Sequence, residues 1–235
     1  LPFSITANNT VDINGGAIDG TNIGASSAGT GAFTTLAASG ALTVAGITTI
    51  TTADNLDTLT LISTDTDANA GPNLNLYRNQ GTDEGDDDVL GQIKFTGRNN
   101  NEQDVLFYRQ DVQSSDVSDG AEDAQVRHLL MRAGSEVEYI RMNATGYVFN
   151  EGGVDLDFRV ESDTITHALF VQGSDGNVGI GTNNPGGAYV NADDLVVGNT
   201  SGAHGITIAS QNNTTGALNF ADALAGDDGA ASYAG

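Results

Sequence analysis

The segment from Phe158 to Pro185, FRVESDTITHALFVQGSDGNVGIGTNNP, most constrains what this chain can fold into. Its centre reads NVGIGT and places Val178 and Ile180 between glycines, and a polar NNP turn follows. This pattern has no helical period, and glycine lets neighbouring backbones come close because it has no Cβ. We therefore expect a short, tightly packed strand here, within an all-β fold.

The two glycines around Ile180 allow a sharper expectation. If Val178 and Ile180 lie in a close-packed strand, Gly179→Val or Gly181→Val should disrupt assembly by steric overlap. The two glycines also share a parity along the strand. Both positions could therefore face solvent, where a β-branched residue would be tolerated.

The composition limits how much core one chain can build. Of the 235 residues only 38% are hydrophobic, 31 are Gly, none is Trp and three are Pro. Few Pro and few charges argue against a disordered linker. A chain with so few large apolar residues gains burial by associating with further chains. We expect an elongated homotrimeric fibre.

The charge distribution excludes several partners. The net charge is −23, and all eight cations lie between positions 78 and 159. Without a basic patch the chain has no means of tracking nucleic-acid phosphates, and adhesion to anionic membranes is disfavoured for the same reason. No apolar run has membrane length, so we expect no membrane insertion. Cysteine is absent, which excludes disulfides and thiolate metal sites.

Residues 1–70 form a low-complexity segment. Single apolar residues recur among small ones, at spacings that fit neither a helix stripe nor one long strand. The pattern favours very short strands and turns repeated along an axis, as in a β-helix or fibre shaft. A flexible Gly/Ser/Thr linker is the alternative. Asp65, Asp67 and Asn69 are expected to form turns, as are Asp175 and Asn177.

Residues 71–157 predict a compact β module. Polar turns separate short runs with strand character, which indicates a small β-sandwich-like domain. The strands expected from position 56 onward are Leu56–Ser63, Asn73–Arg78, Val89–Thr96, Val105–Val112, Ala124–Arg132, Glu136–Asn143 and Tyr147–Asn150. The window 119–133 has some helix-forming residues, but we favour a strand for 125–132. Residues 158–190 then form a junction, and 191–235 begin a further β segment.

Several phrases along the chain carry a family resemblance. Residues 17–24 read AIDGTNIG, 30–36 TGAFTTL, 155–162 DLDFRVES and 216–222 GALNFAD. Together with NVGIGT, and in this order, they resemble the tail fibres and related virion proteins of tailed phages, particularly marine and cyanobacterial ones. The runs at 72–79, 90–99 and 119–123 look like a module common in such fibres.

The resemblance implies a structural role. It implies a virion fibre, outside the cell, that links the particle to a distal tip for host-receptor binding, with other tail or baseplate proteins as neighbours. In that family the GALNFAD phrase usually precedes more strands and often a self-cleaving chaperone. Neither follows here, and the chain begins at Leu1, so we expect it to be part of a longer polypeptide.

One acidic cluster is the only candidate metal site. It comprises Asp83, Glu84, Asp86, Asp87 and Asp88. Calcium takes six to eight hard oxygen ligands, but the spacing differs from that of an EF-hand loop. A solvated turn is the simpler interpretation. We expect no metal that folding requires, and no cofactor.

No catalytic motif stands out. His128, His167 and His204 are scattered singly, whereas zinc needs three or four converging ligands. A Gly-x-Ser-x-Gly elbow is missing, so we expect no enzyme. The aromatic residues Phe95, Phe107, Phe149, Phe158, Phe170 and Phe220 should lie in the core or in axial contacts between chains.

Three other functions stay open. The central segment, the only one with mixed charge, could itself bind a receptor or glycan. The chain could belong to a depolymerase spike, although stacking aromatics are sparse. A non-viral extracellular bacterial filament or adhesin is the third.

Overall fold

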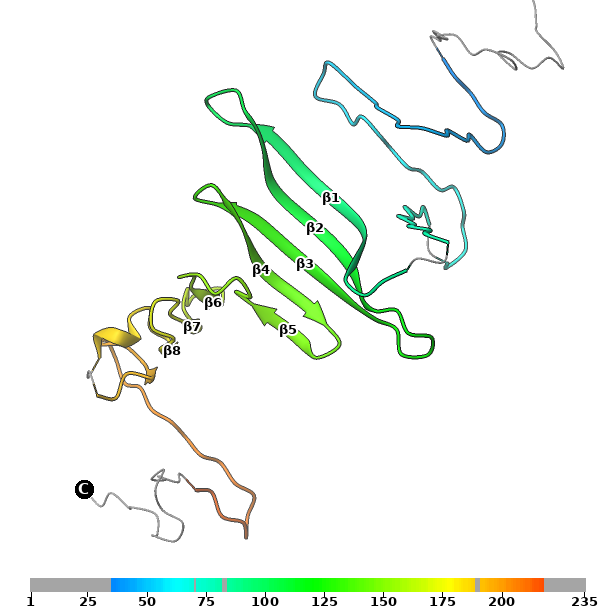
Figure 1. Ribbon diagram of the computed structural model, residues 1–235. Coiled ribbons are helices and arrows are strands. Elements are labelled where there is room, and N and C mark those ends of the chain that lie inside the picture. The colour runs from blue at the N-terminus through cyan, green and yellow to red at the C-terminus, as the bar shows by residue number, and fades with distance from the viewer. Residues whose placement is uncertain (1–34, 70, 82–83, 189–190, 218–235) are drawn as a thin grey trace, which may run out of the picture. The chain divides into compact units, whose positions relative to one another are not determined.

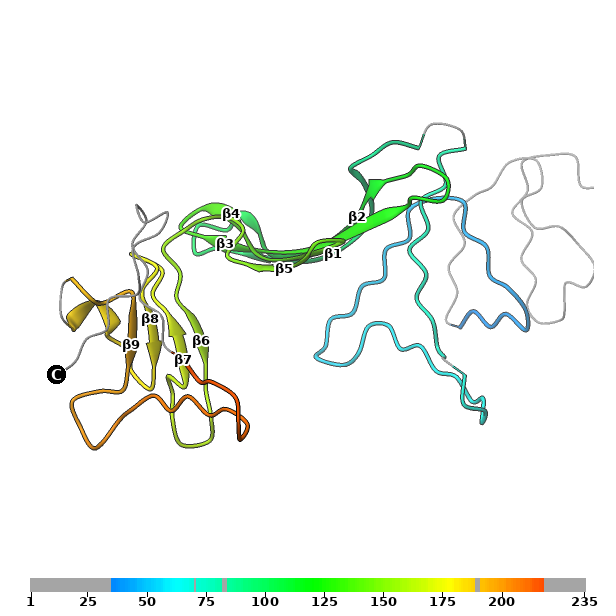
Figure 2. The ribbon, with the colours of Figure 1, turned by 90° about the horizontal axis from the view of Figure 1, so that it is seen from below.

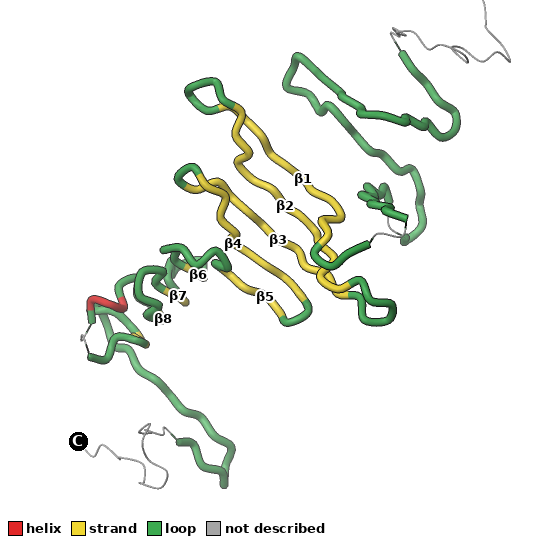
Figure 3. The backbone as a smooth tube through the Cα atoms, viewed as in Figure 1, coloured by secondary structure: helices red, strands yellow, loops and turns green. Residues whose placement is uncertain are grey.

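The computed structural model describes residues 35–69, 71–81, 84–188 and 191–217. The chain divides into two compact units, Leu1–Pro72 and Asn73–Gly235. In the described part, regular structure comprises nine strands and one short 3-10 helix (Figures 1 and 3). The expected all-β fold class is confirmed.

The described part of the first unit contains no strand. The expected strand at Leu56–Ser63 is therefore wrong, as are short strands anywhere in residues 35–69. The apolar side chains Ile47, Leu56 and Ile62 are exposed. A strand requires a ladder partner, and these residues find none among the described residues of their unit. The phrase at 17–24 and residues 30–34 of the next phrase lie outside the described residues.

Turn chemistry in this unit follows the prediction. The backbone N–H of Asp67 donates to the Asp65 carboxylate at 3.2 Å, and that of Asn69 donates to Asp67 at 2.8 Å. The Asn69 side-chain amide also donates to Asp67, at 2.8 Å. The two bonds from Asn69, the backbone bond most of all, lower the pKa of the exposed Asp67 carboxyl. Local side-chain bonds of this kind compete with regular structure.

The second unit begins with a five-stranded antiparallel sheet. Its strands follow chain order, each paired with the next. They are β1 (Asp88–Arg98), β2 (Asp104–Asp116), β3 (Asp123–Arg132), β4 (Ser135–Asn143) and β5 (Gly146–Phe149). The five strands expected between 89 and 150 are confirmed, including the strand favoured over a helix at 125–132.

The sheet is a single layer, so the expected sandwich is wrong for residues 71–157. Figure 2 shows the five strands edge-on as one curved band. Alternating residues suit either arrangement, because a strand pattern does not reveal what covers each face. The tight turn at Ala133 and Gly134, both with positive φ, joins β3 to β4 as primed hairpin turns do.

The expected strand at Asn73–Arg78 is also wrong. This segment joins β1 through side chains instead. The Arg78 Nη1 atom donates to the Val89 carbonyl at 2.8 Å, and Nη2 lies 3.1 Å from the Asp88 carboxylate. Leu76 packs where Gly91 leaves room, since a Cβ at Gly91 would lie 2.9 Å from the Leu76 Cβ.

A second, smaller sheet follows. Its strands are β6 (Phe158–Val160), β7 (Leu169–Val171), β8 (Val178–Ile180) and β9 (Leu195–Val197), in that order. The predicted strand at Val178–Ile180 is confirmed as β8, antiparallel to β7 and parallel to β9. The polar turn after it contains the 3-10 helix η1 (Pro185–Gly187). The sheet crosses residue 190, where a division was expected.

Gly179 and Gly181 serve different purposes. Gly179 is buried, and a Cβ there would lie 2.6 Å from the Thr182 carbonyl oxygen. Gly181 has open space around it but a φ of +74°, which L-residues rarely adopt. Close packing therefore applies to Gly179, whereas Ile180 on the other face stays 39% exposed.

Adding a methyl group at Gly179 should destabilise the small sheet. We expect Gly179→Ala to lower the unfolding free energy by about 1–3 kcal/mol, as overpacking typically does, and Gly179→Val to lower it more. The matched control is Gly205→Ala, where the added Cβ meets nothing within 4 Å. Urea unfolding at equal protein concentration measures both, and equal midpoints for Gly179→Ala and the parent would contradict the close contact.

Candidate functional site: the two faces of the five-stranded sheet

The five-stranded sheet carries different chemistry on its two faces. The pairing register assigns each residue to a face, because cross-strand partners share a face and neighbours along a strand alternate. The polar face comprises Gln92, Lys94, Arg109, Asp111, Gln113, Gln125, Arg127, Leu129, Glu136, Glu138, Arg141 and Val148. The apolar face comprises Ile93, Phe95, Tyr108, Gln110, Val112, Val126, His128, Leu130, Val137, Ile140, Met142, Tyr147 and Phe149.

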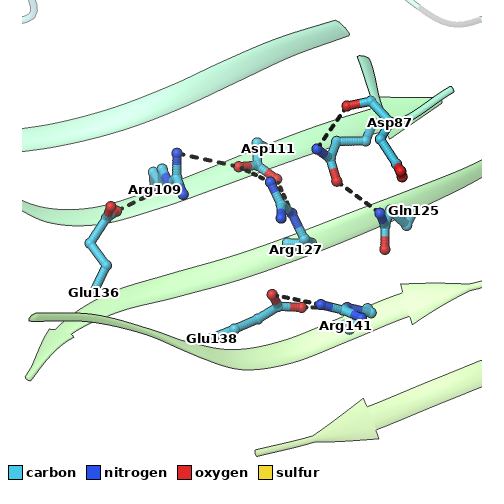
Figure 4. Close-up of polar contacts among 9 residues, drawn as sticks. Asp87, Arg109, Asp111, Gln125, Arg127, Glu136, Glu138 and Arg141 are labelled. Atoms are coloured by element: carbon cyan, nitrogen blue, oxygen red, sulfur yellow. Dashed lines mark hydrogen bonds and ion pairs between the residues drawn. The ribbon is translucent and has the colours of Figure 1, made fainter. Parts of the chain in front are cut away.

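Asp111 is the centre of the polar face. Its side chain is fully buried, and it lies opposite Arg127 in the β2–β3 register. Arg127 donates from Nε at 2.8 Å and from Nη2 at 3.1 Å, one bond to each carboxylate oxygen. Arg109 Nη1 adds an ion pair at 3.7 Å (Figure 4). The two cations thus offset the cost of burying the carboxylate, which is large for an unpaired charge.

The network extends along the sheet in both directions. Arg109 Nε lies 3.1 Å from the Glu136 carboxylate, without the alignment of a hydrogen bond. Toward the other end, Gln125 donates to the Gln113 side chain at 2.8 Å, and Gln113 donates to the Asp87 carbonyl at 3.1 Å. Side-chain contacts therefore bind β2, β3 and β4 together beyond the backbone ladder.

A second ion cluster lies on β4. Arg141 donates two hydrogen bonds to Glu138, at 2.6 and 3.0 Å, and also lies 2.8 Å from Glu151. The bonds to Glu138 raise the pKa of the Arg141 guanidinium above its ordinary value. Carboxylates held by guanidinium groups in this way make poor general bases and poor metal ligands. The polar face is thus suited to holding the sheet together.

The apolar face is open in the single chain. None of the residues named for this face carries a full charge, yet Phe95 is 59%, Tyr147 73% and Phe149 53% exposed. The rings of Phe95 and Tyr108 lie 5.5 Å apart, and the Tyr108 hydroxyl bonds His128 Nδ1 at 2.7 Å. Exposed apolar surface of this extent normally marks a contact surface.

A groove lies where the chain crosses this face. Its volume is about 320 Å³, and its lining includes Tyr108, His128, Tyr139, Phe149, Leu156 and Phe158. The rings of Phe149 and Phe158 are 5.0 Å apart. Several polar side chains in the lining already have partners within the chain: Tyr108 bonds His128, Asn150 bonds Val154, and Asp157 accepts from the Gly173 N–H. An apolar occupant therefore fits the groove better than a sugar does.

The residues of the predicted acidic cluster bond to different partners within the chain. Asp83 lies outside the described residues. Asp86 accepts a hydrogen bond from the Val117 N–H at 3.0 Å, and Asp88 accepts one from the Gly85 N–H at 3.1 Å while pairing with Arg78. Glu84 and Asp87 lie in the same turn, where Asp87 has a φ of +64°. Among the described residues no three His, Asp or Glu side chains are placed to hold a metal ion.

Each of the three histidines contacts a different set of residues. His128 bonds Tyr108, whereas His167 bonds the Thr166 hydroxyl at 2.9 Å and packs edge-on against Phe170. His204 Nε2 lies 2.9 Å from the Ser201 carbonyl. Their interpretation as structural or surface residues fits these contacts.

The predicted aromatic core is only partly present. Phe170 is 4% exposed and lies in the core of the small sheet, with Phe158 half-buried at its edge. Phe95, Phe107 and Phe149 are exposed, so the expectation that they fill this chain's own core is wrong. Phe220 lies outside the described residues. Contacts between chains remain the alternative for the exposed rings.

Asp111 is the residue that sequence reasoning missed. It was simply included within the expected strand Val105–Val112. A signal existed: Arg109 and Asp111 share a face two residues apart, and Arg127 occupies the following strand. Only the register reveals that the three meet.

Comparisons with known proteins assign no family. No family model matches the chain, and no curated protein is similar to it. In the part of the chain that the structure describes, no helix is long and apolar enough to cross a membrane. Any assignment of function therefore depends on the chain's own surfaces.

Removing the Asp111 charge should destabilise the sheet. Asp111→Asn leaves Arg109 and Arg127 without their shared carboxylate, and we expect a loss of about 3 kcal/mol in unfolding free energy, as when a buried pair is broken. The control is Asp104→Asn, whose ion pair with Arg98 is exposed and should contribute less than about 1 kcal/mol. Chemical denaturation followed by circular dichroism compares them, and equal losses would contradict the central role of Asp111.

Proposed function

We propose that the chain is a structural segment of a phage tail fibre, and that it links the virion to a distal tip that binds the host receptor. The segment acts mechanically as a homotrimer, outside the cell, with other tail or baseplate proteins at its ends. It needs no cofactor and performs no catalysis. Receptor binding belongs to the whole fibre.

The observation that carries the proposal is how little apolar core the described residues of one chain contain. Among the described residues the buried hydrophobic side chains are Leu129 and Phe170. A single layer of five strands with an uncovered apolar face is marginal in water, since independent stability needs a packed face. A fibre made of several identical chains supplies the missing cover, and the ordered phrases from IDGTNIG to GALNFAD support a tail fibre in particular.

The polar face supports a mechanical role over a catalytic one. A glycosidase needs two carboxyl groups free to exchange protons or attack a sugar. The carboxylates of Asp111, Glu136 and Glu138 are each engaged by an arginine. The pairs that cross from strand to strand, Asp111 with Arg127 and Glu136 with Arg109, resist sliding of one strand past another, which suits a fibre that transmits force.

The aromatic groove favours a receptor- or glycan-binding module as the second candidate function. The surface that its lining exposes is mostly apolar, however, and sugars are normally recognised through several hydrogen bonds. A glycan array probed with the full chain separates the two functions: specific binding that Phe149→Ala abolishes would favour the binding module. The fibre proposal expects no specific binding.

Sedimentation tests the assembly directly. The purified chain should sediment under native conditions at three times its 24.0 kDa mass and form thin rods in negative-stain micrographs. Since association couples to folding, dilution should lower the melting temperature. A well-folded monomer at micromolar concentration would overturn the proposal.

Chelation tests the proposed independence from metal. We expect the same melting temperature with and without excess EDTA, because Asp86 and Asp88 already have partners in the protein. A fall of about 10 °C or more that calcium reverses would show a stabilising site, since ligand binding to the native state raises stability. Release of sugar from host envelope polysaccharide by the chain would contradict the non-catalytic role.

A further inference from the structure

We infer that the apolar face of the five-stranded sheet is the surface through which copies of this chain contact one another, with the groove beside Phe149 as the recess that a neighbouring copy fills. The inference rests on the proposed function, because it names the surface that the assembly uses. It assigns the polar face to solvent.

The first argument is area. Full burial of an aromatic side chain removes 150–250 Å² from water, so the exposed fractions of Phe95, Tyr147 and Phe149 leave roughly 350 Å² of aromatic surface on one face. A stable interface buries about 800 Å² on each partner. Three side chains thus supply a large share, and Ile93 and Leu130 on the same face are also exposed.

The second argument is charge. Each chain carries a net charge of −23, so two copies repel wherever their acids come together. The residues named above for the apolar face include no Asp, Glu, Lys or Arg, whereas the polar face carries both ion clusters. Arg132, at the β3 end of the apolar face, donates to the Asp155 carbonyl at 2.7 Å. A copy can approach the apolar face without burying an unpaired charge, and an oppositely charged partner would find nothing there to recognise.

The third argument is that the described residues of the second unit cover only the two ends of this face. Leu76 packs against Gly91 at the β1 edge, and Leu156–Phe158 line the groove over the β4–β5 end. Between them Phe95 and Tyr147 stay exposed. An apolar side chain fits the groove. Every copy of the chain carries both the groove and a face with such side chains, so a second copy can fill the groove of the first.

Adjacent residues on β5 provide a matched pair for the test. Tyr147 lies on the apolar face, whereas Val148 lies opposite Arg141 on the polar face. In Tyr147→Asp, assembly would bury an unpaired carboxylate, and we expect the copies to associate at least about 100-fold more weakly. Val148→Asp introduces the same charge on the other face and should leave association unchanged. Sedimentation over a dilution series of the full chain measures both.

A second variant covers the case in which Tyr147→Asp does not fold. The chain has no cysteine, so Tyr147→Cys and Val148→Cys each introduce a single thiol. In the native assembly a maleimide should label Cys at 148 rapidly and Cys at 147 slowly. Dilution below the dissociation range, or mild urea, should expose the thiol at 147.

The outcomes distinguish an error in the proposed fibre from an error in the inferred contact surface. If the parent chain is a folded monomer, the proposed fibre itself is wrong. If the parent assembles but Tyr147→Asp assembles equally well, or the thiol at 147 reacts as fast as that at 148, the assembly uses another surface. The inference would also be wrong if the thiol at 147 were protected from maleimide only after a different protein is added, and not by copies of this chain.

Discussion

The second unit depends on burial of a sheet face that its own described residues leave exposed. Its five-stranded sheet is a single layer: ion pairs cover one face, and the other face is apolar. Backbone pairing fixes the strands, but hydrophobic burial is the dominant favourable term in folding. In the described residues that term is small for one chain, since few hydrophobic side chains are buried. In the proposed fibre, copies of the chain supply the rest.

On the polar face, a charged carboxylate is buried within a single-layer sheet. Asp111 is fully buried although no second layer of the described second unit covers it, because the arginine side chains beside it exclude water. Pairing between β2 and β3 places Asp111 opposite Arg127, so a slip of one residue would move the carboxylate to the apolar face. The network therefore specifies register as well as stability. A sheet whose register is fixed within one chain can present the same apolar surface in every copy.

Sequence patterns predicted the local structure well where strands pair with their chain neighbours. The runs from Val89 to Phe149 alternate clearly and lie between turn residues, so all five strands were found. The segments Leu56–Ser63 and Asn73–Arg78 look alike by composition but form no ladder, because strand formation depends on a partner that a sequence pattern does not show. The Asp111 network was missed for the same reason: residues 16 apart meet only through the register.

The central claim is that Phe95 and Tyr147 are buried between chains although they are exposed within one chain. Hydroxyl-radical footprinting of the native protein, read out by mass spectrometry, measures the solvent access of each aromatic side chain. Tyr77 is the internal reference, since it is 76% exposed, close to the 73% of Tyr147. The account predicts that Phe95 and Tyr147 are protected in the assembly while Tyr77 is oxidised readily. Oxidation of all three at similar rates, in a particle that sediments as an assembly, would contradict it.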